Sequence, residues 1–219
     1  MKDIKDGIFV LEAADTLPED GSINKLLRPF KNPSVVAVGG RPVPMNNPKN
    51  FFGFVSQMIW NLHHRVSMYK RVKLSGEFCA FRAKLVNKVP HDIMVDDAFI
   101  ESVIRQQGYK VIYVPDSVVY MRGPENILDF MNQRSRVHEG YFQIKKLFNI
   151  IVPTTNPLTI FKVLPIGEHT TKKEFSWAAL AIALETYAYG LAFFNFFRGK
   201  KEFSWIQIKS TKDLGKDSQ

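Results

Sequence analysis

Apolar runs and amphipathic stretches alternate along the first 149 residues of the chain. Short runs rich in β-forming residues predict buried strands, and they cover residues 7–11, 35–38 and 109–114. Apolar positions at helical spacing predict helices over residues 18–30, 51–69, 97–107 and 126–148. Residues 74–82 predict a turn that enters a further strand. This order of elements favours an α/β sheet with flanking helices.

Glycine and proline mark several expected boundaries. We expect the second strand to end at the glycines 39–40, and the helix 97–107 to end at Gly108, because glycine readily adopts the backbone conformation of a helix C-terminus. A turn is expected at Pro115-Asp116, after the strand 109–114. Gly140 is a candidate interruption of the last helix, since glycine weakens helix interiors.

The composition changes after residue 149. Residues 150–174 include Pro153, Pro157 and Pro165, which argue against one continuous helix because proline breaks helix interiors. We interpret this stretch as an interfacial linker. The chain ends in a basic tail, residues 198–219, with six Lys or Arg against three acids.

Between the linker and the tail, residues 175–197 form a mostly apolar segment of 23 residues. That length suits a bilayer span. Glu185 near its centre is costly at mid-membrane depth unless it faces protein. Two interpretations therefore stay open, a transmembrane helix or an interfacial one. Basic residues flank both ends, so the distribution of positive charge predicts no orientation.

Composition and charge narrow the class of protein. The chain is 45% hydrophobic and 23% charged, which is typical of a globular protein and excludes a disordered one. Its net charge of +9 suits anionic headgroups or a diphosphate, although a solvated basic face is an equally simple explanation. No nucleic-acid-binding motif accompanies the charge, so we expect no nucleic acid partner.

The single cysteine and the N-terminus indicate a reducing compartment. Since Cys79 is the single cysteine, the chain cannot form an internal disulfide. Cys79 also has no evident base partner in the sequence, so we interpret it as a small core residue. Residues 1–6 are polar and lack the apolar core of a secretory signal. His63-His64 is a weak candidate for a metal site, because adjacent residues on a helix point in different directions.

Three groups of polar residues could carry chemistry. Asp15 follows the first strand, and open α/β sheets bind ligands at the carboxyl ends of their strands. Asp96 and Asp97 begin a predicted helix, where one carboxylate can favour the helix start while the other serves as a base. The third group begins at Gln133, 36 residues past Asp97.

The third group is the segment Gln133-Arg134-Ser135-Arg136-Val137. Gln133 and Arg136 are three residues apart on a predicted helix and hence share one face. Such a face can bind a diphosphate or sugar hydroxyls. A solvated arginine pair is the alternative for this segment taken alone.

Together these segments resemble family 2 glycosyltransferases, in particular the branch with cellulose, chitin and hyaluronan synthases. Ala13-Ala14-Asp15 matches the family's D-x-D motif at its second Asp only, since Ala13 replaces the first. Ser75-Gly76-Glu77-Phe78 looks like its glycine-containing acceptor segment, and Val95-Asp96-Asp97 like its T/S-E-D motif. The segment that begins at Gln133 matches Q-x-x-R-W, with Val137 in place of tryptophan. That replacement weakens the case for a processive polysaccharide synthase.

The resemblance implies a partial GT-A (Rossmann-like) sheet over residues 1–149, followed by a membrane-associated helix. It also implies inverting transfer of a sugar from a nucleotide-diphosphate sugar to a glycan or lipid acceptor. Asp97 would be the catalytic base, and Asp15 would hold Mg²⁺ or Mn²⁺ on the diphosphate. The substrate-binding residues would be Gly76, Glu77, Asp96, Gln133, Arg134 and Arg136. The catalytic part would be cytoplasmic, at a membrane.

The family's nucleotide-binding segment has no counterpart among the 14 residues before Asp15. We therefore expect the chain to be the C-terminal part of a glycosyltransferase, paired with an N-terminal half or a partner chain, because sheet edges left open invite pairing. The alternative is a catalytically incomplete membrane protein that keeps this fold for assembly.

Overall fold

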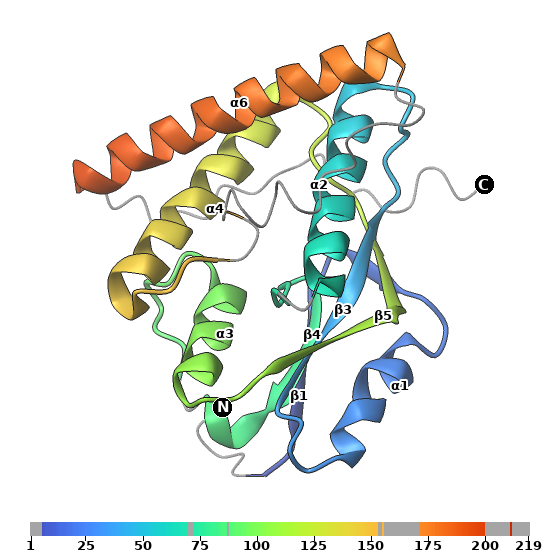
Figure 1. The fold of residues 1–219 in the computed structure, drawn as a ribbon, viewed down its shortest axis with the longest axis vertical. Helices are drawn as coiled ribbons and strands as arrows, with labels where there is room; N and C mark the ends of the chain where they lie inside the picture. Colours follow the sequence, from blue (N-terminus) through green and yellow to red (C-terminus); the bar gives the residue numbers. More distant parts are fainter. Residues whose placement is uncertain are drawn as a thin grey trace.

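A computed structural model describes residues 6–69, 72–86, 88–152, 155, 171–199 and 211 of the chain. The strands are β1 (Ile8–Glu12), β2 (Thr16–Pro18), β3 (Ala37–Pro44), β4 (Phe78–Arg82) and β5 (Val111–Met121). The helices are α1 (Ser22–Leu27), α2 (Phe51–Met68), α3 (Asp96–Gln106), α4 (Ile127–Phe148) and α6 (Lys172–Phe197), with 3₁₀ turns at Arg28–Lys31 and Ala83–Leu85. Figure 1 shows helices around one mixed sheet, which confirms the predicted α/β class.

The five strands form one sheet in the order β1-β4-β3-β5-β2. Only β3 and β5 are parallel; the other neighbours are antiparallel. The β3–β5 pairing aligns Gly39 with Tyr113 and Arg41 with Val118, so β5 carries extra residues at this point. The sheet is therefore irregular at its centre, and such irregularities bend strands and re-aim side chains.

Alternation along the central strands fills two cores. Phe78 and Ala80 of β4 pack with Leu26 and Phe30 on the α1 side of the sheet. Cys79 and Phe81 point the other way, toward a core that includes Ile100 and Ile104 of α3. Because successive strand residues face opposite sides, four consecutive apolar residues in β4 bury both faces. Cys79 is fully buried, which confirms it as a core residue.

The pairing of strands in the sheet corrects four expectations drawn from the sequence. The first strand is at the sheet edge and half-exposed, not buried. Residues 16–18 form strand β2 instead of leading into a helix, and that helix begins only at Ser22. β3 continues past residues 39–40 to Pro44, and Pro115-Asp116 lies inside β5. In the last three cases a neighbouring strand supplies hydrogen bonds that keep the chain extended, which local propensity does not reveal.

The long helices agree with the sequence pattern. α2 begins at Asn50, whose side chain accepts a hydrogen bond from the Gly53 N–H, and α4 begins after Asn126 in the same manner. Gly108, at φ 82°, follows the end of α3 as expected. α4 runs without interruption through Gly140. A Cβ at that position would lie 2.5 Å from Val95 Cγ2, so the glycine serves close packing of α4 against the start of α3.

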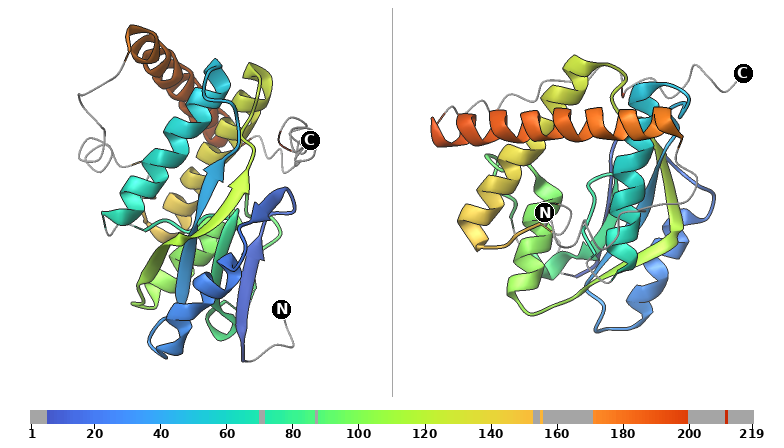
Figure 2. Two further views of the ribbon diagram at one scale, coloured as in Figure 1. Left: turned by 90° about the vertical axis from the view of Figure 1, so that its right-hand side faces the viewer. Right: turned by 45° about the horizontal axis from the view of Figure 1, so that its top comes forward.

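α6 lies across the end of the molecule formed by α4 and the start of α2 (Figure 1; Figure 2, right). Trp177 packs against Phe51 and Phe54 of α2, while Phe142 of α4 contacts Tyr189 and Phe196. The predicted linker lies mostly outside the described residues, as does nearly all of the basic tail.

Candidate active site

Asp97 is the centre of the best-defined polar cluster in the described part of the chain. Its Oδ2 accepts hydrogen bonds from Lys73 Nζ at 2.8 Å and from the Gly76 N–H at 3.1 Å. Its Oδ1 accepts from the Ala98 N–H at 2.7 Å. Asp97 begins α3, whereas Lys73 and Gly76 belong to the segment that enters β4. The carboxylate thus fastens the start of the helix to the segment that resembles an acceptor loop.

Lys73 is a buried cation, with its side chain 7% exposed. Besides Asp97, its ammonium donates to the Leu74 carbonyl at 2.7 Å. His63 Nε2 lies 3.1 Å from the Lys73 carbonyl oxygen. Burial lowers the pKa of His63 to about 3, so this histidine is neutral and adds no charge near the ammonium.

The pKa of Asp97 follows from these contacts. Burial by itself would raise it, but the Lys73 ammonium and the N–H groups of Ala98 and Gly76 outweigh burial and lower it. The pKa of Lys73 is raised in return, because the attraction of Asp97 outweighs the cost of burying the ammonium. The pair is therefore ionised at neutral pH.

Asp96 lies in a different electrostatic environment from its neighbour. Burial and the charge of Asp97 raise its pKa. Arg136 on α4 opposes this shift. Burial lowers the pKa of Arg136 itself, against the attraction of Asp96, Asp97 and Glu77. The side chains of Asp96 and Asp97 lie beside Gly76, and the charge of Arg136 acts on both acids and on Glu77.

The segment around Gly76 also links this cluster to Asp15. The Ala13 N–H donates to the Glu77 carbonyl at 3.2 Å, which holds the chain after β1 beside the acceptor-like segment. Asp15 follows two residues later, and its Oδ2 accepts a hydrogen bond from Thr211 at 3.3 Å. Asp15 is therefore at the end of β1 that faces the site, as the sequence predicted.

Asp15 alone offers too few oxygen ligands for a divalent cation. Phosphate oxygens of a substrate would have to supply the others. Within the described residues, no three His, Cys, Asp or Glu side chains are grouped to hold a metal. Mg²⁺ commonly binds through one or two carboxylates plus phosphate oxygens and water. Asp15 would hold such an ion together with a diphosphate, and it would not form a metal site by itself.

The structure places the predicted site residues of the Gln133–Arg136 group in two different surroundings. Arg136 lies with the acids of the site, and Gln133 is one helical turn away on the same face of α4. Arg134 instead forms a two-pronged ion pair with Glu185 of α6, with Arg134 Nε 2.8 Å from Oε2. His138 Nε2 lies 3.0 Å from Glu185 Oε1. The Arg134 guanidinium is thus already paired with the Glu185 carboxylate. This pairing does not support Arg134 as a substrate ligand.

Sequence reasoning missed Lys73. Its one local signal is a lysine between the apolar residues Val72 and Leu74, in a segment that enters a buried strand. Glu101, also missed, accepts from the Leu74 N–H at 2.7 Å and from Arg105 Nε at 2.7 Å. Glu101 therefore supports the segment that carries Lys73.

His64, the second of the two adjacent histidines, contacts a different part of the chain from His63. Its Nδ1 lies 2.8 Å from the Tyr113 hydroxyl of β5, whereas His63 contacts the segment before β4. The two rings thus point to separate neighbours, as expected for a pair that does not chelate a metal.

Comparison with known proteins identifies the family of the chain. The profile of the family described as glycosyl transferase family group 2 matches residues 8–198. The O-antigen chain rhamnosyltransferase RfbN of Salmonella typhimurium is 27% identical over 126 residues, which cover 52% of this chain and 40% of that protein. A mannosyltransferase from Pyrobaculum calidifontis, solved with GDP-mannose and Mn²⁺, superposes with a TM-score of 0.46 and 19% identity, over 90% of this chain and 51% of that one. The chain thus spans about half the length of these relatives or less.

Proposed function

Since the chain belongs to glycosyl transferase family group 2, we propose that it transfers a sugar from a nucleotide-diphosphate sugar to an acceptor hydroxyl, with inversion at the anomeric carbon. The observation that carries this proposal is the ionised Asp97, held by Lys73 and the Gly76 N–H at the start of α3. General-base chemistry requires a deprotonated carboxylate held in a fixed position, and these contacts support that requirement.

In the proposed reaction Asp97 takes the proton of the acceptor hydroxyl. The acceptor oxygen forms a bond to the anomeric carbon, and the bond from that carbon to the phosphate oxygen breaks. The nucleotide diphosphate leaves with the electron pair. Attack from the face opposite the leaving group inverts the configuration.

Positive charge near the leaving group is the second requirement, because the diphosphate gains charge as it departs. We assign this role to Arg136, with Gln133 as a hydrogen-bonding partner of the donor. Asp15 would hold Mg²⁺ or Mn²⁺, which when bound neutralises the diphosphate. Asp96, Gly76 and Glu77 would line the acceptor side.

We also propose that the chain works with a further strand or chain, at a membrane, with its catalytic part in the cytoplasm. β1 is at the sheet edge and pairs only with β4 among the described strands. Open edges of this kind favour strand addition. The further strand would supply nucleotide binding, either from a longer protein or from a partner, and a lipid-linked or glycan acceptor would approach from the membrane.

A second candidate function is a non-catalytic subunit that uses the open β1 edge for assembly. One assay separates the two functions. The chain, alone and with membranes from its producing cells, is incubated with Mn²⁺ and a panel of radiolabelled uridine, guanosine and thymidine diphosphate sugars. Transfer of label, with the opposite anomeric configuration in the product by NMR, supports the glycosyltransferase. Absence of both transfer and nucleotide-sugar binding under every condition favours the subunit.

A further inference from the structure

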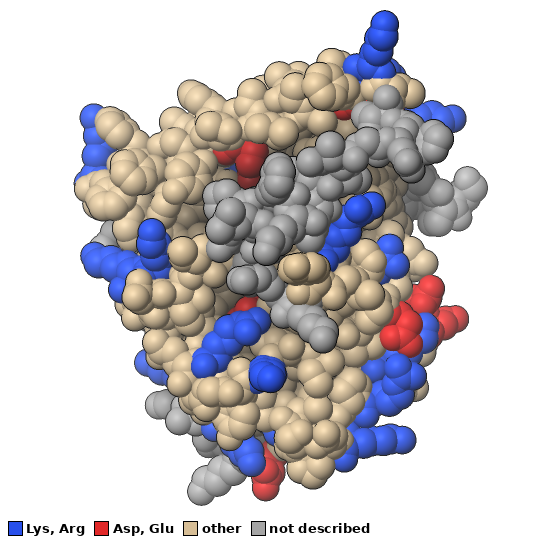
Figure 3. All heavy atoms as spheres, viewed as in Figure 1, with Lys and Arg blue, Asp and Glu red and all other residues tan. Residues whose placement is uncertain are grey.

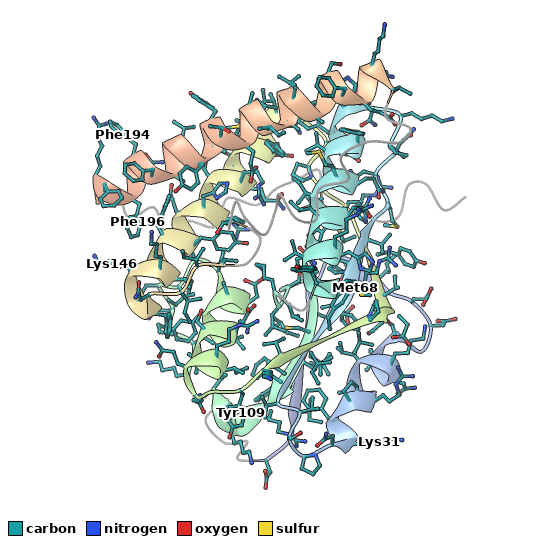
Figure 4. The ribbon with its side chains drawn as sticks, viewed as in Figure 1. Lys31, Met68, Tyr109, Lys146, Phe194 and Phe196 are labelled. Carbon is teal, nitrogen blue, oxygen red and sulfur yellow. The ribbon has the colours of Figure 1, made fainter. Side chains whose placement is uncertain are left out.

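Lys73 is a buried cation that has no part in the proposed proton transfer. Figure 3 shows basic side chains that project from this face of the molecule into solvent, the usual position of lysine. Lys31 and Lys146 point outward in this manner (Figure 4). The side chain of Lys73, by contrast, is only 7% exposed. A buried charge needs a partner, and the partner of Lys73 is the carboxylate of Asp97.

The hydrogen bonds of Asp97 differ between its two carboxylate oxygens. A carboxylate accepts about four hydrogen bonds, two at each oxygen. Oδ2 accepts two, from Lys73 Nζ at 2.8 Å and from the Gly76 N–H at 3.1 Å, so its capacity is filled. From the described residues, Oδ1 accepts one, from the Ala98 N–H at 2.7 Å. Oδ1 is therefore the oxygen that can accept a further proton donor.

The ammonium of Lys73 also distinguishes Asp97 from the acid beside it. Burial by itself would raise the pKa of Asp97, but Lys73 and the backbone N–H groups outweigh burial and lower it. Burial and the charge of Asp97 raise the pKa of Asp96. Of these two adjacent carboxylates, the one bound by Lys73 thus carries its negative charge more readily.

Other ionisable groups surround the pair on several elements. They are Asp96 and Glu101 of α3, Arg136 and Tyr141 of α4, His63 of α2, Glu77 before β4 and Cys79 within it. Burial lowers the pKa of His63 to about 3 and raises the pKa of Cys79, so both are neutral near pH 7. Burial also raises the pKa of Asp96 and Glu101. These groups are the same in a native chain and in a Lys73 variant, so a comparison of the two isolates the effect of the ammonium.

We propose that Lys73 is a positioning residue for the base: its ammonium holds Asp97 Oδ2, so that Oδ1 takes the proton of the acceptor hydroxyl. The proton moves from the acceptor oxygen to Oδ1, and Lys73 keeps its own protons throughout. The acceptor oxygen then bonds to the anomeric carbon and the nucleotide diphosphate leaves, as in the proposed function, on which this inference rests. Groups that hold a reacting atom in place in this way contribute to the rate.

The pH dependence of sugar transfer tests the proposal. The full native chain and Lys73→Met are compared at about pH 5.5 and about pH 8, once circular dichroism has shown that the variant is folded. Without the ammonium, burial raises the pKa of Asp97, and a protonated carboxyl cannot act as a base. The loss of transfer in Lys73→Met should therefore be roughly tenfold greater at the lower pH than at the higher one. An equal loss at both would mean that Lys73 is only structural and would overturn the proposal.

Two further variants control this comparison. Lys31→Met makes the same change at an exposed lysine, and it should transfer sugar as the native chain does at both pH values. Val72→Ala loosens the same buried segment without removing a charge, so its loss of transfer should be equal at both. A pH-dependent loss in Val72→Ala as large as that in Lys73→Met would also overturn the proposal.

A second measurement depends neither on activity nor on the folding of Lys73→Met. Carboxyl-carbon NMR of the native chain, with Asp97→Asn to assign the signal, follows the titration of Asp97. This carboxyl should titrate below the ordinary aspartate value of about 3.9, and titration above that value would overturn the proposal. Transfer by Asp97→Asn at the native rate would overturn the assigned base and the role of Lys73 together. Loss of transfer in Asp97→Asn, with an equal loss at both pH values in Lys73→Met, would overturn the role of Lys73 alone.

Discussion

Asp97 and Lys73 form a buried ion pair at the candidate active site, with side chains 14% and 7% exposed. The carboxylate is also bound by two backbone N–H groups, which explains how a helix start can hold a charge away from water. In the proposed reaction, a carboxylate fixed so firmly would lose little entropy when the acceptor arrives. The same contacts make both residues important for stability as well as for chemistry.

For Asp97→Asn we expect transfer to fall by about 10²–10⁴-fold, the usual contribution of a general base. The amide keeps the size of the side chain but leaves the buried Lys73 ammonium without its anionic partner, so circular dichroism must show that the variant is folded before the transfer rates are compared. Asp92→Asn is the matched control, because Asp92 is exposed in the loop before α3. Transfer by Asp97→Asn at the native rate would refute the assignment of the base.

Lys73→Met should lower the free energy of unfolding at pH 7 by about 3–5 kcal/mol, the cost of breaking a buried ion pair. The folded pKa of Asp97 is lowered, so the pair stabilises the protein above the unfolded aspartate pKa of about 3.9. This stability is lost as the pH falls through the folded pKa. The difference between variant and native chain should therefore shrink below about pH 4. Urea unfolding from pH 3 to 7 measures this difference, and a pH-independent value would contradict the ion-pair explanation.

At the scale of elements, the packing of α4 against the start of α3 places Arg136 near the acids. Gly140 permits this packing, since a Cβ there would lie 2.5 Å from Val95 Cγ2 and 2.9 Å from Cγ1. Val95 directly precedes Asp96 and Asp97. Displacement of α4 at this point would therefore change the geometry of the site.

Gly140→Ala should destabilise the chain by about 1–2 kcal/mol, because the cost of overpacking exceeds the gain in helix propensity. It should also reduce nucleotide-sugar binding, since Arg136 is four residues away on the same helix. The double variant Gly140→Ala/Val95→Ala removes the clash and should recover both properties. Thermal unfolding and calorimetry measure them. Failure of the second substitution to restore binding would show that the glycine has another role.

At the scale of the whole molecule, α6 is joined to the sheet domain mainly through α4. Glu185 receives both Arg134 and His138, and Asn195 donates to Glu139 at 3.1 Å. These bonds join α6 to the helix that carries Arg136.

Glu185→Gln should loosen α6 without unfolding the sheet domain. Arg134 would be left with an uncompensated buried charge, and we expect a loss of about 1–3 kcal/mol that appears as faster hydrogen exchange in α6. Exchange in β3 and β4 should stay unchanged. Asp20→Asn, an exposed acid far from α6, is the control. Equal protection of α6 in both variants would mean that apolar packing alone holds the helix.

The sequence by itself determined the long helices, because their apolar spacing is a local feature. α2, α3 and α4 agree with it within one residue at each end. The sequence also predicted Asp15, Asp96 and Asp97 as site residues, because their order along the chain resembles that of the acidic motifs in a known family. Most of its errors concern strands, whose ends depend on partners far along the chain: β5 continues through Pro115 beside β3, and β1 is an edge. The first helix also begins later than expected, at Ser22.

Only the tertiary structure decided which charges meet. Lys73 reaches Asp97 across 24 residues and Arg134 reaches Glu185 across 51, and no local pattern encodes either pair. The same contacts separated Arg134 from Arg136. The reason is physical: helix spacing is a property of neighbouring residues, whereas a buried charge is stable only where the fold supplies its partner.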